Sequence, residues 1–532
     1  MTWHVVWVLL GKAALVFAVA GVFAFAWLLP RHGGHLLREP ASRALRHPLL
    51  DGLWRRAPRL HAFLERHLHL ARRSWLRLAI GCLVAACGLV WYVRLLHGVL
   101  ADGTLVEADR CLHNTVGRFH SAALSQLYSL VSNLSSIVFL APLAGGLAAV
   151  FWAAGRRREA AGLIAALAGA GLLQTVMKGV VARPRPPEAL ALFHDFSFPS
   201  GHTLMGVSVY GFLVYLVLRD EPRRAWHWLL AAPLLLLIGA IPVARVYLGV
   251  HWPYDTAASL ALAVAWLAVL VSLVKFPPFQ QPTPTTKADR PWLGSALTAT
   301  VAALAVYAAV LNAQRPQRKV EALRAPPRMI TTTPLLVAYP TVLSRTSQDA
   351  VGGPMEPVSM LFIGESASLV ATFQRAGWEL AEAPTVHGLL RELWAVLRNQ
   401  ADPRGPATPA YLARQPQDLT FEKAGDPSGS IRRRHHTRLW QTALCMAPGC
   451  QPLWVATASY DAGVKLVREP YLITHRIDPR VDMERDYIAR DLLRAGAQEI
   501  AVLQITQGPT EGRNAAGDPF QTDGRAYAFV VR

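Results

Sequence analysis

Eight long apolar segments constrain this chain most strongly, because each approaches the length needed to cross a lipid bilayer. About 20 consecutive apolar residues form a helix that spans the hydrocarbon core. The fifth segment is the shortest and has room to begin one turn earlier. The sequence therefore predicts an all-α polytopic membrane helix bundle, with segments at roughly 3–29, 75–97, 128–154, 160–182, 202–218, 228–250, 255–275 and 292–313.

Composition agrees with a membrane protein that also carries a soluble part. The 532 residues are 52% hydrophobic and only 17% charged, whereas soluble domains average about 25% charged residues. This excludes a disordered or fibrous protein and disfavours an entirely soluble enzyme. We expect four regions: a transmembrane anchor with an Arg-rich cytoplasmic loop (1–74), a helical core (75–276), a linker with the eighth helix (277–313) and a soluble C-terminal domain (314–532).

The positive charge predicts the orientation in the membrane. The net charge of +19 is spread over short loops rather than gathered in one patch, so we expect no nucleic-acid partner. The basic loops all fall on one side if the eight segments alternate, and that side should be the cytoplasm. They are 30–74, 156–158, 219–224 and the residue Lys275. The C-terminal domain is then expected outside.

The first segment has an alternative interpretation as a cleaved signal peptide, because residues 24–26 resemble a cleavage site. No basic stretch precedes the segment, it is long, and the Arg cluster follows it. We therefore interpret residues 1–29 as an uncleaved anchor.

Three polar motifs stand at the expected outer ends of the apolar segments. The first is Lys178 with Arg185 and Pro186, at the end of the fourth segment. The second is 199–202, Pro-Ser-Gly-His, at the start of the fifth. The third is an Arg, a His and an Asp between the sixth and seventh. The motif residues with expected roles are Lys178, Arg185, Ser200, Gly201, His202, Arg245, His251 and Asp255.

These residue types are suited to phosphoryl chemistry. Three fixed cations, one Lys and two Arg, can surround a phosphate dianion. Ser200 and Gly201 open a helix whose N-terminal N–H groups attract anions. Asp255 lies four residues after His251, so in a helical turn it can hold one ring nitrogen and leave the other to attack phosphorus. His202 is a second imidazole that can protonate the departing oxygen.

The three motifs resemble those of the type 2 phosphatidic acid phosphatase (PAP2) family. The resemblance covers about 75–275 and implies a six-helix membrane core. It also implies a phosphohistidine at His251, with His202 as general acid and Asp255 as the residue that orients the ring of His251. It implies phosphate binding by Lys178, Arg185, Ser200, Gly201 and Arg245, with no metal and no cofactor. The family usually has Ser before the Arg of the third motif, whereas this chain has Ala244. Arg183 begins a second Arg-Pro pair two residues before Arg185 and is a further candidate for contact with substrate.

The C-terminal part reads as a soluble α/β or α+β domain. Strand-like runs lie at 358–363, 453–459, 499–506 and 526–531, and helical patterns at 366–380, 386–399 and 483–495. About 325–532 resembles the LssY C-terminal domain family, through the runs at 435–440 and 474–479. Its polar residues match no standard metal signature, so we expect structural or solvated roles for His435, His436, His475, Asp478 and Asp482, and a solvated loop at Arg432–Arg434.

The sequence therefore predicts a membrane lipid phosphatase that hydrolyses a lipid phosphomonoester or diphosphate. The setting suits a bacterial inner membrane with the site and the tail in the periplasm, and leaves the oligomeric state open. Two alternatives remain: a vanadate-dependent haloperoxidase-like oxidoreductase, and a non-catalytic envelope or export scaffold. In an oxidising periplasm, Cys445 and Cys450 are expected to form a disulfide across a Pro-Gly turn.

Overall fold

The chain divides into two compact units in the computed structural model. Among the residues that the structure describes, one unit is a helical core that contains 58–101 and 120–275, and the other joins 103–119 to the C-terminal residues from 328 onward. The structure describes residues 58–101, 103–187, 195–219, 225–275, 307, 310, 328–330, 343–382, 391, 407–425, 433–467, 472–506 and 509–532.

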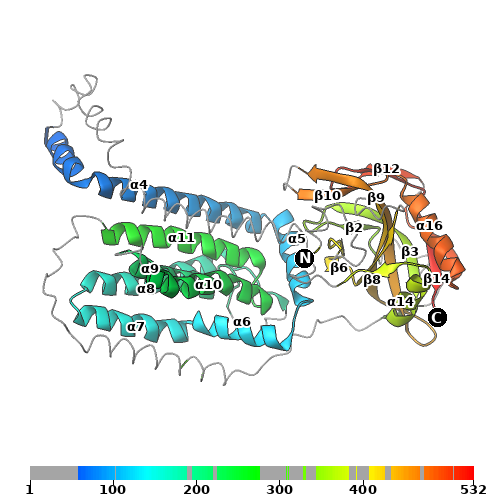
Figure 1. Cartoon of the computed structure of the whole chain (residues 1–532), viewed down its shortest axis with the longest axis horizontal. Helices are drawn as coiled ribbons and strands as arrows, with labels where there is room; N and C mark the ends of the chain where they lie inside the picture. The colour runs from blue at the N-terminus through cyan, green and yellow to red at the C-terminus, as the bar shows by residue number, and fades with distance from the viewer. Residues whose placement is uncertain are drawn as a thin grey trace. The chain divides into compact units, whose positions relative to one another are not determined.

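Seven helices of the described chain make up the core unit (Figure 1). They are α4 (Pro58–Leu100), α6 (Ala122–Leu134), α7 (Ile137–Ala153), α8 (Arg157–Val181), α9 (Gly201–Leu218), α10 (Ala225–Tyr247) and α11 (Pro253–Lys275). Five of these helices contain segments long and apolar enough to span a membrane, and α6 with α7 form a sixth candidate span bent by 47°. This confirms a helical membrane core for predicted segments two to seven. The first segment lies outside the described residues, and so does the eighth apart from Tyr307 and Val310.

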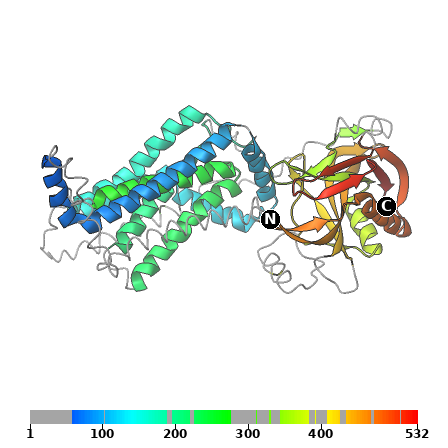
Figure 2. The ribbon, with the colours of Figure 1, turned by 90° about the horizontal axis from the view of Figure 1, so that it is seen from above.

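Helix α9 lies at the centre of the core. In its apolar window 61% of residues are buried, against 28% in the corresponding windows of α8 and α10. Helices α8, α10 and α11 all pack against it, and they run side by side in both views (Figures 1 and 2). Small residues permit this close packing, as in many membrane bundles. A Cβ added to Gly162 of α8 would lie 2.4 Å from the ring of Phe212 on α9.

Two sequence predictions for the core were wrong in extent. Helix α4 begins at Pro58, so the cytoplasmic loop predicted for 30–74 is helical from that residue on. Residues 98–127, which separate the second and third predicted segments, contain a helix, α5 (Thr104–Gly117), and the start of α6. Both errors have one cause: hydropathy detects the apolar stretch of a helix and misses polar or amphipathic turns.

The C-terminal domain is built on a mixed sheet. Its strands follow the order β11-β14-β3-β9-β8-β7-β4, with β10 beside β9, β1 beside β8, and β2, β5 and β6 continuing from β3. Strands β14 and β3 are parallel, as are β1 and β8, and the remaining pairs in this sheet are antiparallel. The strands are β1 (Arg328–Ile330), β2 (Thr346–Gln348), β3 (Pro354–Ile363), β4 (Glu379–Leu380), β5 (Tyr411–Leu412), β6 (Gln415–Pro416), β7 (Leu419–Ala424), β8 (Arg434–Met446), β9 (Gln451–Val467), β10 (Leu472–Ile477), β11 (Gln498–Gln504), and β14 (Arg525–Val530); β12 (Thr510–Arg513) pairs separately with β13 (Pro519–Thr522).

Both faces of this sheet are buried, which explains the apolar run 360–363 that ends β3. Met360 and Phe362 pack on the face covered by α14 (Ser366–Arg375) and α16 (Val481–Arg494). Leu361 and Ile363 face the opposite side, in a separate apolar cluster. Successive side chains of a strand point to opposite faces, so a strand that is buried on both sides is apolar at consecutive positions instead of alternating.

The structure confirms the mixed α and β character of this domain. The four predicted strands correspond to β3, β9, β11 and β14, although the last two predictions extend two residues past β11 and one past β14, and the helix predicted at 483–495 corresponds to α16. Helix α14 ends at Arg375, five residues before the predicted end, where Gly377 (φ +81°) reverses the chain. The helix predicted at 386–399 lies outside the described residues apart from Arg391.

The solvated loop predicted for Arg432–Arg434 was wrong at its last residue. Arg434 lies in β8, is 8% exposed and forms ion pairs with Glu422 and Asp461. The expected disulfide is confirmed: Cys445 and Cys450 are bonded, with 4.7 Å between their Cα atoms.

Candidate active site

The first motif is placed by the end of α8. Lys178 lies in the last turn of this helix, and Ala182 ends the helix in the left-handed conformation, with φ at 49°. The N–H of Ala182 bonds to the carbonyl of Lys178. The chain then extends through two Arg-Pro pairs, which cannot continue a helix because proline disfavours the α region in the residue before it. This turn brings both Arg183 and Arg185 close to the third motif.

Lys178 and Arg185 share one carboxylate, that of Asp195. Arg185 donates from Nη2 to Oδ1 of Asp195 at 2.7 Å and from Nε to the same oxygen at 3.1 Å, and Lys178 Nζ contacts the other oxygen. Burial alone would raise the pKa of Asp195, but the hydrogen bonds and charges of the two cations outweigh burial and lower it. No role was predicted for Asp195, although an acidic residue in the connection between the first and second motifs was a usable signal. A carboxylate thus occupies the position in which these cations would hold a phosphate oxygen.

His251 is enclosed between Arg185 and Asp255. Its side chain is 1% exposed. Nε2 lies 3.4 Å from Nη1 of Arg185, and Nδ1 lies 3.6 Å from Oδ2 of Asp255. The second distance exceeds a hydrogen bond, as is common in catalytic sites without substrate. Burial, aided by the charges of Arg245 and Arg185, lowers the pKa of His251 to about 4, so the ring is neutral at pH 7.

Asp255 is held by two groups for which the sequence did not predict this role. Arg183 Nη1 donates to its Oδ1 at 2.6 Å, and the backbone N–H of Trp252 donates to Oδ2 at 3.0 Å. The guanidinium carbon of Arg183 also lies 5.6 Å from the centre of a Trp252 ring. Arg183 therefore contacts the carboxylate that faces His251.

The second motif opens α9 beside the third. The backbone N–H of Ser200 donates to Oγ of Ser259 at 2.6 Å, and this hydroxyl donates to the carbonyl of Asp255 at 2.6 Å. Ser259 thus ties the start of α9 to α11, a role that its spacing of four from Asp255 could have indicated. Gly201 and His202 are the first two residues of α9, and the side chain of Ser200 makes no capping bond. The N–H groups of a first helical turn have no partner within the helix and can serve an anion.

Arg245 is buried in the last turn of α10 and donates from Nη1 to Oγ of Ser132 on α6 at 2.5 Å. Ala244 provides no hydroxyl beside this Arg, but Ser132 provides one from a neighbouring helix. Arg245 is also close enough to act electrostatically on His251. The three motifs, far apart in the chain, therefore meet in one buried region of the core unit.

The polar residues of the C-terminal domain do not converge in the same way. His435 and His436 are adjacent in β8, so their side chains point to opposite faces of the sheet. His435 bonds to Glu484 at 2.8 Å, and His436 bonds to Ser459 at 2.6 Å. Within the described ranges, no group of three His, Cys, Asp or Glu side chains is placed to hold a metal ion.

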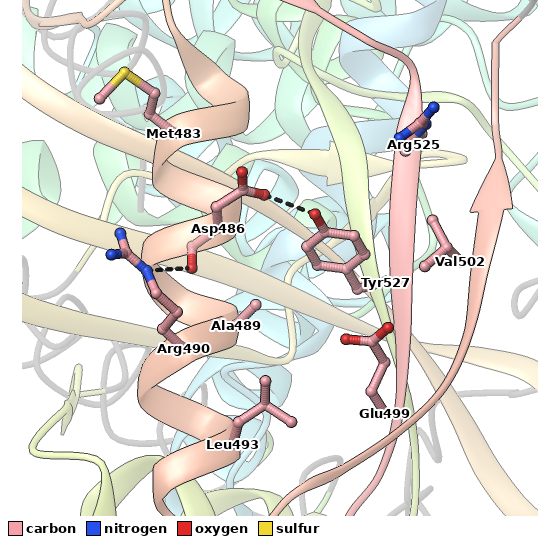
Figure 3. A pocket seen from close by; sticks show the side chains of 9 residues that line it. All are labelled: Met483, Asp486, Ala489, Arg490, Leu493, Glu499, Val502, Arg525 and Tyr527. Atoms are coloured by element: carbon pink, nitrogen blue, oxygen red, sulfur yellow. Dashed lines mark hydrogen bonds between the residues drawn. The ribbon is translucent and has the colours of Figure 1, made fainter.

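The acidic side chains near α16 bond within the domain. Asp482 accepts from Oγ1 of Thr522 at 2.8 Å. Figure 3 shows a surface pocket between α16 and strands β11 and β14, where Asp486 accepts a hydrogen bond from Oη of Tyr527 at 2.9 Å. These contacts support structural roles for the two aspartates.

Family comparisons match both parts of the chain. Residues 159–279 match the PAP2 superfamily model, and this matched range contains all three motifs. Residues 339–526 match the LssY C-terminus model. The chain therefore joins a PAP2 region to an LssY C-terminal region. Together with the apolar helices, the PAP2 match identifies a multi-pass membrane protein.

Two curated proteins resemble the PAP2 region. Phosphatidylglycerophosphatase B of Bacillus subtilis (strain 168) is 25% identical over 176 residues, which are 32% of this chain and 85% of that protein. The bacitracin transport permease protein BcrC of Bacillus licheniformis is 36% identical over 86 residues, 15% of this chain and only 37% of that protein. This chain also aligns with a crystal structure of a transmembrane PAP2-type phosphatidylglycerolphosphate phosphatase from Bacillus subtilis. The sequences are 20% identical, the alignment covers 37% of this chain and 98% of the other chain, and the TM-score is 0.34.

Proposed function

We propose that this protein is a lipid phosphatase that transfers phosphate to His251 and then to water. The observation that carries the proposal is the environment of His251. This ring is buried and neutral at pH 7, with Nδ1 turned to Asp255 and Nε2 turned to Arg185. A neutral imidazole with one oriented nitrogen and a cation beside the other is suited to attack a bound phosphate.

The reaction has two steps in this proposal. In the first, Nε2 of His251 forms a bond to the terminal phosphorus, and the bond from that phosphorus to the leaving oxygen breaks. This oxygen belongs to the lipid in a monoester and to the lipid phosphate in a diphosphate, and His202 gives it a proton. In the second, water attacks the phosphohistidine, inorganic phosphate leaves, and His202 takes the proton of the water. Asp255 stabilises the positive charge that the ring of His251 gains in each step.

The phosphate would lie among the cations of the three motifs. Lys178, Arg185 and Arg245 provide charge, and Ser200 and Gly201 provide the start of α9. Asp195 would leave its two cations when phosphate enters, since one anion replaces the other. Arg183 would position Asp255 rather than bind substrate, because its guanidinium already contacts that carboxylate.

The lipid chains would stay in the bilayer while the headgroup enters the site. Support comes from the apolar helices that surround the motifs and from the similarity to phosphatidylglycerophosphatase B. The charged loops support an orientation with the site and the C-terminal domain in the periplasm. A reporter fused after Arg532 and active only outside the cytoplasm would test that side directly.

Release of inorganic phosphate from a panel of lipids tests the function. The panel contains phosphatidylglycerophosphate, phosphatidic acid, undecaprenyl diphosphate and lipid A, presented to full-length protein in detergent. We expect turnover of at least one monoester or diphosphate. We expect His251→Ala and His202→Ala each to reduce it by at least about 10². Activity of His251→Ala near that of the unaltered protein would overturn the proposal.

A further inference from the structure

The LssY C-terminal region presents a surface that binds helix α5 of the same chain. Helix α5 follows the first described core helix and belongs to the same compact unit as the C-terminal domain. At the centre of this contact, Cys111 of α5 packs with Ala350 and Tyr411, and each of the three is at most 5% exposed. Thr115 and Tyr411 share a buried hydrogen bond of 2.9 Å between their hydroxyl groups. We call Ala350, Tyr411, Arg414 and Asp418 the α5-binding surface.

Charged pairs of opposite polarity border this centre. Near the start of α5, Glu107 accepts two hydrogen bonds from Arg414, at 2.6 and 2.9 Å. Just past its end, Arg118 donates to Asp418 at 2.7 Å and to the carbonyl of Pro416 at 2.8 Å. An apolar centre with a polar border is the usual anatomy of a specific protein interface. Because the two pairs differ in polarity, α5 fits in one direction only.

The backbone of the binding surface is itself specialised. Ala413 and Arg414 form the two-residue turn between β5 and β6, and both have positive φ, at 48° and 70°. Asn-Gly is the usual sequence for such a turn, and a residue with a side chain pays an energetic cost there. Two residues of α5 hold Arg414 in this conformation. Asn114 donates to the backbone carbonyl of Arg414 at 3.0 Å, and Glu107 accepts from the side chain of Arg414. Unfavourable backbone geometry of this kind is concentrated at functional sites.

The chain that leaves α5 reaches the C-terminal end of α10, the helix that carries Arg245, within a few residues. His120 bonds through Nε2 to the carbonyl of Tyr247 at 2.5 Å, and the N–H of Ser121 bonds to the hydroxyl of Tyr247 at 2.8 Å. Tyr247 lies two residues after Arg245 and four before His251. Arg118, fixed on the C-terminal domain, and His120, fixed on α10, are two residues apart, a span of at most about 7 Å.

We propose that the C-terminal domain acts on the phosphatase by holding α5, and so sets the position of Tyr247 and Arg245 at the site. The expected effect on activity rests on the proposed function, whereas the expected effect of α5 on the position of Tyr247 does not. Release of α5 would remove the restraint on His120 and Ser121, and through Tyr247 would loosen the outer end of α10.

A charge exchange at Arg118 and Asp418 tests this coupling in the full-length protein. Arg118→Asp and Asp418→Arg are each expected to reduce kcat/KM for the lipid substrate at least threefold. Each should also speed amide hydrogen exchange in residues 104–121 and 244–252. The combination Arg118→Asp with Asp418→Arg should recover at least half of the activity and the slow exchange. Arg480→Asp, which breaks an exposed ion pair with Asp478 elsewhere in the domain, is the matched control and should change neither.

The outcomes separate the two proposals. If exchange rises in 244–252 and is restored by the double change, the coupling holds even where no lipid of the panel is hydrolysed. If exchange rises in α5 alone, or if the double change restores nothing, the coupling is wrong while the proposed function stands.

Discussion

Arg183 donates a 2.6 Å hydrogen bond to one carboxylate oxygen of Asp255, while the other oxygen faces His251 at 3.6 Å. The side chains of Arg183 and Asp255 are 9% and 0% exposed. A buried carboxylate that loses its cation is strongly destabilised. The pair therefore fixes both the charge and the direction of Asp255, and through Asp255 the ring of His251.

Substitution of Arg183 should slow chemistry rather than weaken binding. We expect Arg183→Gln to lower kcat by about tenfold or more with KM changed less than threefold, because loss of about 1.4 kcal/mol in the transition state is tenfold in rate. Arg183→Lys should recover part of kcat, since it restores the charge. Steady-state kinetics checks this, with Arg157→Gln at the exposed start of α8 as the control.

Combined variants distinguish positioning from substrate contact. If Arg183 acts through Asp255, Arg183→Gln should cost little more in an Asp255→Asn background, because residues that act as a unit are not additive. A higher KM with unchanged kcat in Arg183→Gln would place Arg183 in contact with substrate instead.

Asp195→Asn should tighten phosphate binding. The carboxylate of Asp195 contacts both Lys178 and Arg185, so it competes with any phosphate for them. We expect the inhibition constant of inorganic phosphate and the KM of the lipid to fall by about three- to tenfold, equivalent to about 0.7–1.4 kcal/mol. Asp195→Glu keeps the charge and should leave both constants within twofold. A rise in both constants for Asp195→Asn would mean that this carboxylate organises the cations for substrate.

In the pH profile of kcat/KM, the fall in activity on the acid side should occur well below the ordinary pKa of histidine. Burial lowers the pKa of His251 from 6.5 to about 4, so the nucleophile stays neutral until the pH falls through that value. We expect His251 to remain neutral and kcat/KM to remain high at pH 5, and kcat/KM to fall near pH 4 as His251 becomes protonated. Comparing substrates whose phosphate pKa values differ identifies any limb that belongs to the substrate. A limb near 6.5 that is identical for all substrates would contradict the buried, neutral ring.

Cys445 and Cys450 should resist alkylation in denatured protein until a reductant is added, because the structure joins them. Mass spectrometry of the peptide that contains both residues checks this. The closed loop is short, so replacing both with Ser should lower the free energy of unfolding by less than the roughly 3 kcal/mol expected for a 15-residue loop. Labelling of both thiols before reduction would contradict the bond and weaken the case for an oxidising compartment.

The sequence predicted the parts of this molecule whose signals are local. Apolar length predicted the spans of the core, and alternating or continuous apolar runs predicted β3, β9, β11 and β14. The motif spacings predicted His251 beside Asp255. Each of these inferences needed only a segment of the chain and its periodicity.

The features that were missed depend on partners distant in the chain. Strand β8 was not predicted because its polar run contains Arg434, which is buried only because Glu422 and Asp461 lie beside it. Arg183 could not be assigned to Asp255, 72 residues away, without the fold. Helix α5 was not predicted because it is too short and too polar for a membrane span, and its partners in the C-terminal domain lie about 300 positions later.

The central claim is that His251 carries the phosphoryl group, and trapping that intermediate tests it most directly. Full-length protein would be mixed with a lipid whose phosphate is isotopically labelled, quenched in base during a single turnover, digested and analysed by mass spectrometry. The account predicts labelled phosphate on the peptide of His251, increased in His202→Ala if release is slowed and absent in His251→Gln. Label on another residue, or full phosphate release by His251→Gln, would contradict it.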